Sequence, residues 1–464
     1  MIKLAVKMII DKLKLILAVA FIFGLSAFLR VNFIVPSLLL CLLLYLKFRQ
    51  KYPSSPSFKL LNIALLYVIV FVGSYYVSKN GWPIFYVPFC VIPMLAAIMF
   101  GNLELPFLLS AACGLTVASI YGNNLNLGLL FLISGSVSAM LVIGARKRSV
   151  VIRAGLLIGL IQALLLFFVT NFNFYYPFRY LLAVLNGIAC GFIVIGVLPV
   201  FEYLFRTVTN ISLLELADFN HPLLQRLIME APGTYHHSLV VGNLAEAACR
   251  PIGANALLAR IGAYYHDIGK LDKSEYFIEN QDVPLNKHDA LSPSMSKIVI
   301  MNHVKEGVEL ANKYHLNPKL IEFIAQHHGN SLVYYFYRRA LENLEEEQDV
   351  QEEGFRYPGP KPSSKETAVV LLADSVEAAT RSLKDPSPSK IEEVVHKVIN
   401  NKFIDGQLDE CELTLRDLEK ISAIFIRILS GIYHSRIAYP EAATSENNNK
   451  KSTKESSHQP PDQA

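Results

Sequence analysis

Paired cysteines are missing from this sequence. Four of its six cysteines lie in long apolar runs and two lie after residue 206, and none forms a CxxC pair or a regular framework. We therefore expect reduced, buried thiols that pack as small apolar residues, which suits a cytosolic location for residues 206–464. The net charge of +4 is also too small to indicate a nucleic-acid polymer as a partner.

Several familiar catalytic motifs are absent as well. No Gly-x-Ser-x-Gly elbow accompanies Ser238, so we do not expect a hydroxyl nucleophile, although this serine follows a histidine. Neither a Walker phosphate loop nor a Rossmann glycine pattern is present. The chemistry that these absences favour is hydrolysis by metal-activated water.

Charge is scarce in the first 205 residues. A helix needs about 20 apolar residues to cross a bilayer, and eight runs approach that length, at roughly 15–29, 31–46, 60–78, 84–100, 104–121, 126–144, 154–170 and 180–204. We therefore predict that residues 1–205 form a transmembrane domain of about eight helices. No run carries an acidic residue or a histidine near its middle, which favours an anchor over a transporter and leaves a small-ligand site open.

The loops between the runs indicate the orientation of this domain. With the N-terminus inside, twelve Lys and Arg residues fall in inside segments, whereas three, Arg30, Lys79 and Arg179, fall outside. Because positive residues concentrate on the cytoplasmic side of membrane proteins, we place the N-terminus inside. An even number of crossings then returns residues 206–440 to the cytosolic side of the cell inner membrane.

After about residue 207 the pattern changes to amphipathic helical stretches with few strand signals. Pro222, Pro293 and Pro318 mark helix starts, and a further helix is expected over 367–383. We predict an all-α fold in which a polytopic helical membrane domain precedes an all-helical cytosolic domain over 206–440. The tail 441–464 is rich in Ser, Asn, Lys and Pro and is predicted to be disordered.

Side chains with metal-ligand chemistry recur in or beside the predicted helices of the second half. They are five histidines and two aspartates: His237, His266, Asp267, His303, His327, His328 and Asp374. Divalent transition-metal ions bind imidazole nitrogen and carboxylate oxygen, so the set is typical of a two-metal site. A carboxylate directly after a histidine, as in His266-Asp267, can bridge two ions while the histidine binds one.

Two other histidine positions are set aside. His236 and His237 lie about 100° apart on a helix, so only one of them can face a shared site, and we choose His237. The dipeptide His288-Asp289 lies in a polar loop between two prolines. We expect it to have a structural role at the start of a helix.

The motifs around these residues resemble those of a known family. They comprise residues 233–238 (GTYHHS), 241–246 (VGNLAE), 265–270 (YHDIGK), 286–293, 327–329 (HHG), 355–362 (FRYPGPKP) and 373–379 (ADSVEAA). As a set they resemble the HD-domain phosphohydrolase superfamily, and within it the PgpH-type, seven-transmembrane HD cyclic-di-AMP phosphodiesterases. The resemblance covers residues 206–438 and, by topology, the membrane half.

This resemblance implies hydrolysis of cyclic di-AMP to the linear dinucleotide 5′-pApA by hydroxide activated between two divalent ions, iron or manganese. The ligands of one ion would be His237, His266, Asp267 and Asp374, and those of the other would be Asp267, His303, His327 and His328. Asp267 would bridge the ions, and Lys270, about one turn from His266, would stabilise phosphoryl charge. Arg381 is a further candidate for substrate binding, and a homodimer stays open.

The sequence departs from the family in one respect. Members commonly carry an extracellular HDED domain after the first membrane helix, whereas residues 30–32 join the first two apolar runs directly. An acidic insert at 342–356 is expected to be a solvated loop, with a lid over an anionic substrate as the alternative. Two other functions stay open: hydrolysis of another nucleotide or phosphoester, and a membrane receptor that binds nucleotide without turnover.

Overall fold

The computed structural model describes residues 60–433, apart from 173–174, 206, 282–286 and 343–350, together with scattered positions between 16 and 45. Throughout these residues the regular structure is helical, and the one β-type contact is an isolated bridge between Leu332 and Arg356. The predicted all-α fold is therefore confirmed. Parts of the first two apolar runs, most of the acidic insert and the tail 441–464 lie outside the described residues.

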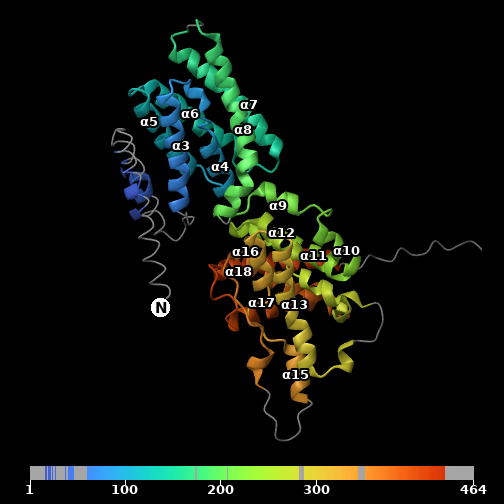
Figure 1. Ribbon diagram of the computed structural model, residues 1–464. Coiled ribbons are helices and arrows are strands. Elements are labelled where there is room, and N and C mark those ends of the chain that lie inside the picture. Colours follow the sequence, from blue (N-terminus) through green and yellow to red (C-terminus); the bar gives the residue numbers. More distant parts are fainter. Residues whose placement is uncertain are drawn as a thin grey trace, which may run out of the picture.

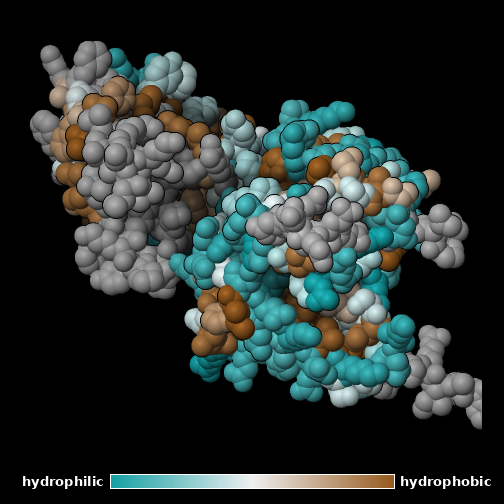
Figure 2. Space-filling model, turned by 90° about the horizontal axis from the view of Figure 1, so that it is seen from below, coloured by the Kyte–Doolittle hydropathy of each residue, from teal (hydrophilic) through white to brown (hydrophobic). Residues whose placement is uncertain are grey.

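The first half is a bundle of apolar helices (Figure 1). Its elements are α3 (Leu60–Lys79), η1 (Ile84–Tyr86), α4 (Val91–Phe100), α5 (Glu104–Ile120), α6 (Leu125–Val142), α7 (Arg148–Val169) and α8 (Pro177–Phe205). Among the described residues, α6, α7 and α8 are long and apolar enough to cross a membrane, and three shorter apolar helical stretches precede them. Figure 2 shows hydrophobic residues over much of the described surface of this bundle and mostly hydrophilic residues over the other half.

Helices α7 and α8 approach each other through glycines. A Cβ atom built on Gly187 would lie 2.2 Å from the backbone nitrogen of Gly159, and one built on Gly155 would lie 2.7 Å from the carbonyl oxygen of Gly187. With Gly191, these residues form two facing GxxxG pairs, the pattern that allows membrane helices to pack backbone to backbone. The two helices therefore act as one closely packed pair.

The second half begins at α9 (Asn210–Leu216), directly after the bundle (Figure 1). Its α-helices are α10 (Pro222–Glu230), α11 (Pro232–Cys249), α12 (Ala256–Tyr265), α13 (Pro293–Lys313), α14 (Pro318–Gln326), α15 (Tyr334–Glu342), α16 (Lys365–Arg381), α17 (Pro388–Ile404) and α18 (Leu415–Ile432). Short 3-10 segments are η2 (Arg250–Ile252), η3 (Ile268–Tyr276), η4 (Ile278–Asn280), η5 (Lys287–Ala290) and η6 (Glu352–Phe355). The helix starts expected at Pro222, Pro293 and Pro318 are confirmed, each after a residue whose side chain caps the helix.

Helix α16 lies at the centre of this half and packs against α11, α12, α14, α17 and α18. Residues 367–374 along it are all buried, which is the pattern of a core helix and not of an amphipathic surface helix. Each fully buried Val or Leu, such as Leu371 and Leu372, contributes about 1.5–3 kcal/mol through removal from water. This burial fixes the position of Asp374 at the end of the buried stretch.

Candidate metal centre

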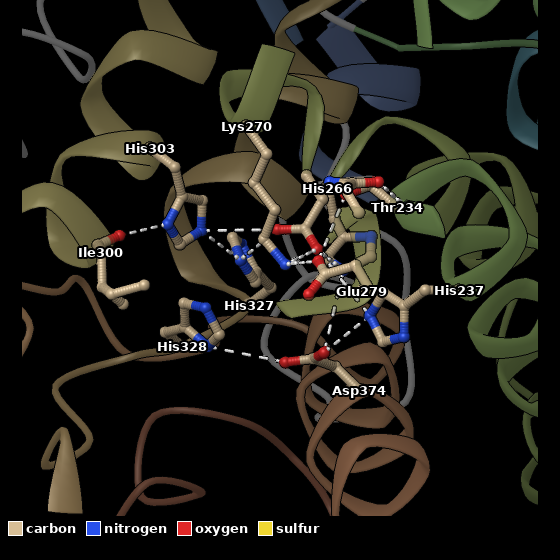
Figure 3. A network of polar contacts seen from close by, with 12 residues as sticks. Thr234, His237, His266, Lys270, Glu279, Ile300, His303, His327, His328 and Asp374 are labelled. Atoms are coloured by element: carbon tan, nitrogen blue, oxygen red, sulfur yellow. Dashed lines mark hydrogen bonds and ion pairs between the residues drawn. The ribbon is translucent and has the colours of Figure 1, made fainter. Parts of the chain in front are cut away.

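Five helices bring the seven predicted ligand residues to one buried point in the second half (Figure 3). They are His237 of α11, His266 and Asp267 at the end of α12, His303 of α13, His327 and His328 at the end of α14, and Asp374 of α16. The two dipeptides stand where a helix stops, so that successive side chains can point to one site although they are adjacent in sequence. At Asp267 the backbone (φ −108°, ψ 16°) has already left the α-helix.

Asp267 lies between two groups of histidines. Its Oδ1 is 3.4 Å from His303 Nε2 and 3.5 Å from His327 Nε2. Its Oδ2 is 3.2 Å from His266 Nε2 and 3.7 Å from His237 Nε2. One carboxylate oxygen thus faces each group, which is the arrangement that a bridging ligand needs.

The ligand atoms form two sets, each with one atom per residue and all atoms within 4.8 Å of one another. One set is His237, His266 and Asp267, and the other is Asp267, His303, His327 and His328. Asp374 lies between the sets, with Oδ1 3.0 Å from His237 Nε2 and Oδ2 3.5 Å from His328 Nδ1. The family resemblance implies that Asp374 binds the first ion alone, whereas its second oxygen faces a histidine of the other set.

Hydrogen bonds behind the site orient several of the imidazoles. The Nδ1 atoms of His266 and His327 lie 2.6 Å and 2.9 Å from the carbonyl oxygens of Ala263 and Ile324, so we assign Nδ1 as the donor. His237 Nδ1 likewise lies 2.5 Å from Glu377 Oε2. Such bonds hold a proton on Nδ1 and aim Nε2 at the centre, where it can bind a metal ion when it carries no proton, as is usual for histidines that bind metals.

Three residues of the centre were missed by the sequence analysis. Glu377 follows Asp374 by three positions on α16, so the helical spacing could have identified it. Glu279 lies 2.8 Å from the Lys270 amine, and Tyr357 stacks on His328 with 4.4 Å between ring centroids. Glu279 lies in the short 3-10 segment η4, where no regular spacing links it to a ligand residue. Tyr357 lies in the motif 355–362, but nothing in that motif marks it as a neighbour of His328.

The predicted phosphoryl-stabilising residue Lys270 lies within the centre. Its Nζ is 2.7 Å from Asp267 Oδ2 and is bound on its other side by Glu279. Arg381, by contrast, lies behind His237, with Nη1 3.6 Å from Glu377 Oε1. The structure therefore brings Lys270, but not the Arg381 guanidinium, into contact with a ligand residue.

The set-aside histidines lie away from the centre. His236 is exposed, while its neighbour His237 is buried. His288 bonds through Nε2 to the carbonyl oxygen of Tyr276 and packs against Phe336, and Asp289 pairs with Arg339 at 3.0 Å. The structural role expected for His288-Asp289 agrees with these contacts.

Burial and charge together set the protonation of the centre. Burial opposes ionisation of Asp267, but the charges of His266 and Lys270 outweigh it and hold the pKa of this carboxyl well below its usual range. Burial lowers the pKa of His303 to about 3, so this imidazole is neutral and able to act as a ligand. Burial also acts to lower the pKa of His237, but its bonds to Asp374 and Glu377 prevail and raise it to about 9.

The centre fits a pair of divalent cations. His266 Nε2 and both carboxylate oxygens of Asp267 are buried and form no hydrogen bond with any residue that the structure describes, although Lys270 makes an ion-pair contact. Buried polar atoms without such bonds are costly, and a metal ion would satisfy them. The donors are all nitrogen and oxygen, which suits first-row transition metals.

Two family models match the chain. The model described as a 7TM receptor with intracellular HD hydrolase matches residues 25–209, and the HD domain model matches residues 234–379. Together with the helical fold and the His/Asp cluster, these matches define a membrane protein with an intracellular HD domain.

Curated relatives narrow this class. The chain is 44% identical over 326 residues to the cyclic-di-AMP phosphodiesterase PgpH of Bacillus subtilis (strain 168), covering 69% of this chain and 45% of that protein. It is 38% identical over 390 residues to PgpH of Listeria monocytogenes serotype 1/2a (strain 10403S), covering 82% of this chain and 53% of that protein. The chain is homologous to these two PgpH proteins, and it spans about half the length of the curated relatives that it matches.

A solved structure is also similar. The HD domain of L. monocytogenes PgpH in complex with cyclic di-AMP has 46% sequence identity and a TM-score of 0.45, covering 47% of this chain and 100% of that chain.

Proposed function

We propose that this chain is a metal-dependent phosphodiesterase that hydrolyses cyclic di-AMP to 5′-pApA. The observation that carries the proposal is Asp267, whose two oxygens face two separate sets of histidines. That geometry is suited to two ions that together bind one phosphodiester group. We take the substrate from the activity for which the two PgpH relatives are named.

Each ion would have four protein ligands, and Asp267 would bind both ions. The first set is His237, His266, Asp267 and Asp374, and the second is Asp267, His303, His327 and His328. Iron or manganese ions bound there would act as Lewis acids toward the phosphate and lower the pKa of bound water.

The other residues of the centre orient these ligands and balance charge. Glu377 holds the Nδ1 proton of His237, and Glu279 anchors Lys270 beside Asp267. The Lys270 ammonium keeps its proton, because the charges of Asp267 and Glu279 overcome the effect of burial and raise its pKa. It can therefore stabilise negative charge that develops on a phosphoryl group.

The substrate would approach from the side of His328. This imidazole is 22% exposed, whereas the side chains of the other six ligand residues are at most 10% exposed. The Tyr357 ring stacked on His328 lines the same side and offers an aromatic face near a phosphodiester bound at the centre.

We also propose that residues 1–205 anchor the chain in the cell inner membrane, with residues 206–440 as a catalytic unit in the cytosol. The apolar helices and the excess of Lys and Arg in the inside loops support this placement. The polar surface of the second half in Figure 2 agrees with it.

The test is a hydrolysis assay in which the full chain is reconstituted in nanodiscs and the protein is loaded with Mn²⁺ or Fe²⁺. We expect conversion of cyclic di-AMP to 5′-pApA and slower turnover of cyclic di-GMP and mononucleotides. Turnover of another phosphoester without turnover of cyclic di-AMP would overturn the substrate assignment, and binding without turnover would favour a receptor.

The matched control for this assay compares two aspartates that each follow a histidine. Asp267→Ala removes the shared carboxylate and should abolish turnover and the binding of both ions. Asp289→Ala removes an exposed carboxylate paired with Arg339 and should leave both unchanged. Normal turnover in Asp267→Ala would exclude the two-metal mechanism.

A further inference from the structure

Helix α9 joins the two halves of the molecule (Figure 1). Ile211 is 2% exposed and belongs to the apolar cluster of the membrane bundle, which also contains Phe205 at the end of α8. Leu213, two residues later, is fully buried in a different cluster with Tyr265 and Leu320 of the second half. This short helix is therefore packed into both hydrophobic cores at once.

Polar contacts fix α9 to the end of α8. The buried carboxylate of Glu202 accepts hydrogen bonds from the backbone nitrogen of Thr209 at 2.9 Å and from the Ser212 hydroxyl at 2.8 and 2.9 Å. The first bond satisfies a free backbone donor at the start of α9, and the other two hold a side chain of its first turn. A movement of the end of α8 must therefore carry α9 with it.

The neighbouring membrane helix is tied to α9 as well. Arg148, the first residue of α7, forms two parallel bonds with Glu215, with Nε–Oε1 at 2.7 Å and Nη2–Oε2 at 3.0 Å. Bidentate pairs of this kind restrict orientation as well as distance. Because α7 and α8 also pack through their glycines, α9 is held by both members of the pair.

On the other side, the α8–α9 segment contacts two helices that end in ligand residues. The Tyr265 hydroxyl donates to the carbonyl oxygen of Leu216 at 2.7 Å, and Tyr265 directly precedes His266. Asn317 Nδ2 donates to the carbonyl oxygen of Thr207 at 3.0 Å, and Asn317 caps α14, which ends at His327. The rings of these two ligand histidines lie edge to face, 4.9 Å apart.

We propose that Tyr265 and Asn317 are positioning residues through which α7 and α8 set the placement of His266 relative to His327, so that the state of the bilayer tunes turnover. The inference rests on the proposed function for its catalytic consequence. Helix α12 is held at its last residue, Tyr265, directly before His266. Helix α14 is held at its N-cap, Asn317, and His327 follows its other end, so both contacts link the α8–α9 segment to a ligand residue. Helix α9 begins five residues after α8 ends, and Glu202 bonds across this interval to Thr209 and Ser212.

Bilayer thickness provides the test, because a change in thickness alters the tilt and packing of membrane helices. In nanodiscs of short-chain and long-chain phosphatidylcholine, we expect the kcat of the full chain to differ by about fivefold, the lower end of typical coupling, with little change in KM. Equal kcat in both bilayers would overturn the inference.

Two variants separate coupling from folding. Tyr265→Phe removes only the hydroxyl that reaches Leu216. Asn317→Asp keeps the oxygen that caps α14 at Lys319 but removes the amide donor to Thr207. The double variant should lose the dependence on thickness, while Tyr337→Phe, a hydroxyl deletion on α15 at the far end of this half, should keep it.

Hydrogen exchange supplies a readout that needs no substrate. In the wild type, amide protection over residues 256–271 and 318–328 should change with bilayer thickness, and in the double variant it should not. An unchanged response in the double variant would contradict the inference. If exchange responds as expected but cyclic di-AMP is not hydrolysed, the coupling stands and the proposed function fails.

Discussion

At the scale of single residues, the centre depends on carboxylates that hold its histidines. Glu377 is an example: its Oε2 accepts the Nδ1 proton of the buried His237, and its Oε1 faces Arg381. Among the described residues its ion pairs are with His237 and Arg381, so its effect on a metal ion acts through His237. Partners of this kind fix the orientation and basicity of a ligand histidine.

The first prediction concerns this carboxylate. Glu377→Gln should weaken metal binding about 10- to 100-fold, since the amide oxygen is a poorer acceptor for the imidazole proton. Equilibrium titration with Mn²⁺ measures the change. Glu393→Gln, at an exposed position on α17, serves as the control and should bind as the wild type does. Equal affinity in the two variants would show that Glu377 does not support His237.

The second prediction is a pH dependence of metal binding. The pKa of His237 is raised to about 9, so at neutral pH its imidazole is protonated in the metal-free protein. A metal ion requires the unprotonated Nε2 and must displace this proton, so the apparent affinity should increase about tenfold per pH unit up to about pH 9. His303 adds nothing in this range, because its pKa of about 3 leaves it neutral.

Calorimetric titration in two buffers with different ionisation enthalpies counts the protons released. We expect about one proton per protein near pH 7, falling toward zero above about pH 9. A constant affinity across this interval would contradict the assigned state of His237.

The candidate ligand residues could be predicted from sequence because several of them are adjacent pairs of side chains that bind metals. His266-Asp267 and His327-His328 each combine two ligand types, and the choice of His237 over His236 follows from the helix geometry. The spacing of Glu377 from Asp374 on α16 is a local signal, but its bond to His237, 140 residues away, is not visible in any one segment. Contacts of that range become visible only when the helices are packed.

At the scale of elements, the close crossing of η3 and α13 sets where His303 stands. A Cβ atom built on Gly269 would lie 1.8 Å from the carbonyl oxygen of His303 and 2.5 Å from the backbone nitrogen of Gly307. Both are backbone atoms that cannot rotate away. The glycine after His266-Asp267 therefore allows one ligand segment to lie directly against another.

The third prediction is that Gly269→Ala separates these two elements. We expect a destabilisation of about 3 kcal/mol or more, at the upper end for overpacked sites, together with loss of the ion that His303 helps to bind. Thermal unfolding and metal analysis measure the two effects.

Gly431→Ala on α18 is the control for this substitution. Its Cβ would meet nothing within 4 Å, so alanine should stabilise the helix by about 0.5–1 kcal/mol. Similar stability in the two alanine variants would show that the η3–α13 crossing can relax.

The starts of helices could be predicted from sequence, whereas the points where two helices contact each other could not. Ser292 and Asn317 cap the helices that begin at the next residue, and both caps are local signals. The 3-10 character of η3 had no such signal, since it results from the turn that follows Asp267 and from contact with α13. The close α7–α8 contact was not predicted either, because it depends on glycine pairs of two different helices facing each other, which no single run shows.

At the scale of the whole molecule, the polar half must lie on the same side of the membrane as the loop between α6 and α7. That loop contains Arg146 and Lys147, and α9 is tied back to the start of α7 through Arg148 and Glu215. The α7–α8 hairpin therefore begins and ends at one membrane face.

The fourth prediction tests this topology with reporters. A fluorescent protein fused after residue 440 should fold and fluoresce in the cytosol, whereas alkaline phosphatase at the same point should be inactive. Alkaline phosphatase inserted at Gly81, in the exposed turn after α3, should be active, since five helical stretches separate this turn from the second half. Alkaline phosphatase activity in the fusion after residue 440 would show that the orientation is opposite to the one we propose.

The position of Asp374 in the chain has a consequence for biosynthesis. Asp374 is separated from His237 by 137 residues, and α16, which carries it, is the helix around which the second half packs. At a synthesis rate of about 5–20 residues per second, roughly 10 s pass between the two residues leaving the ribosome. During that interval the nascent chain is already held by its membrane helices and exposes histidines without the carboxylate that completes their site. With the proposed ligands, we therefore expect the metal centre to be completed only after α16 has left the ribosome.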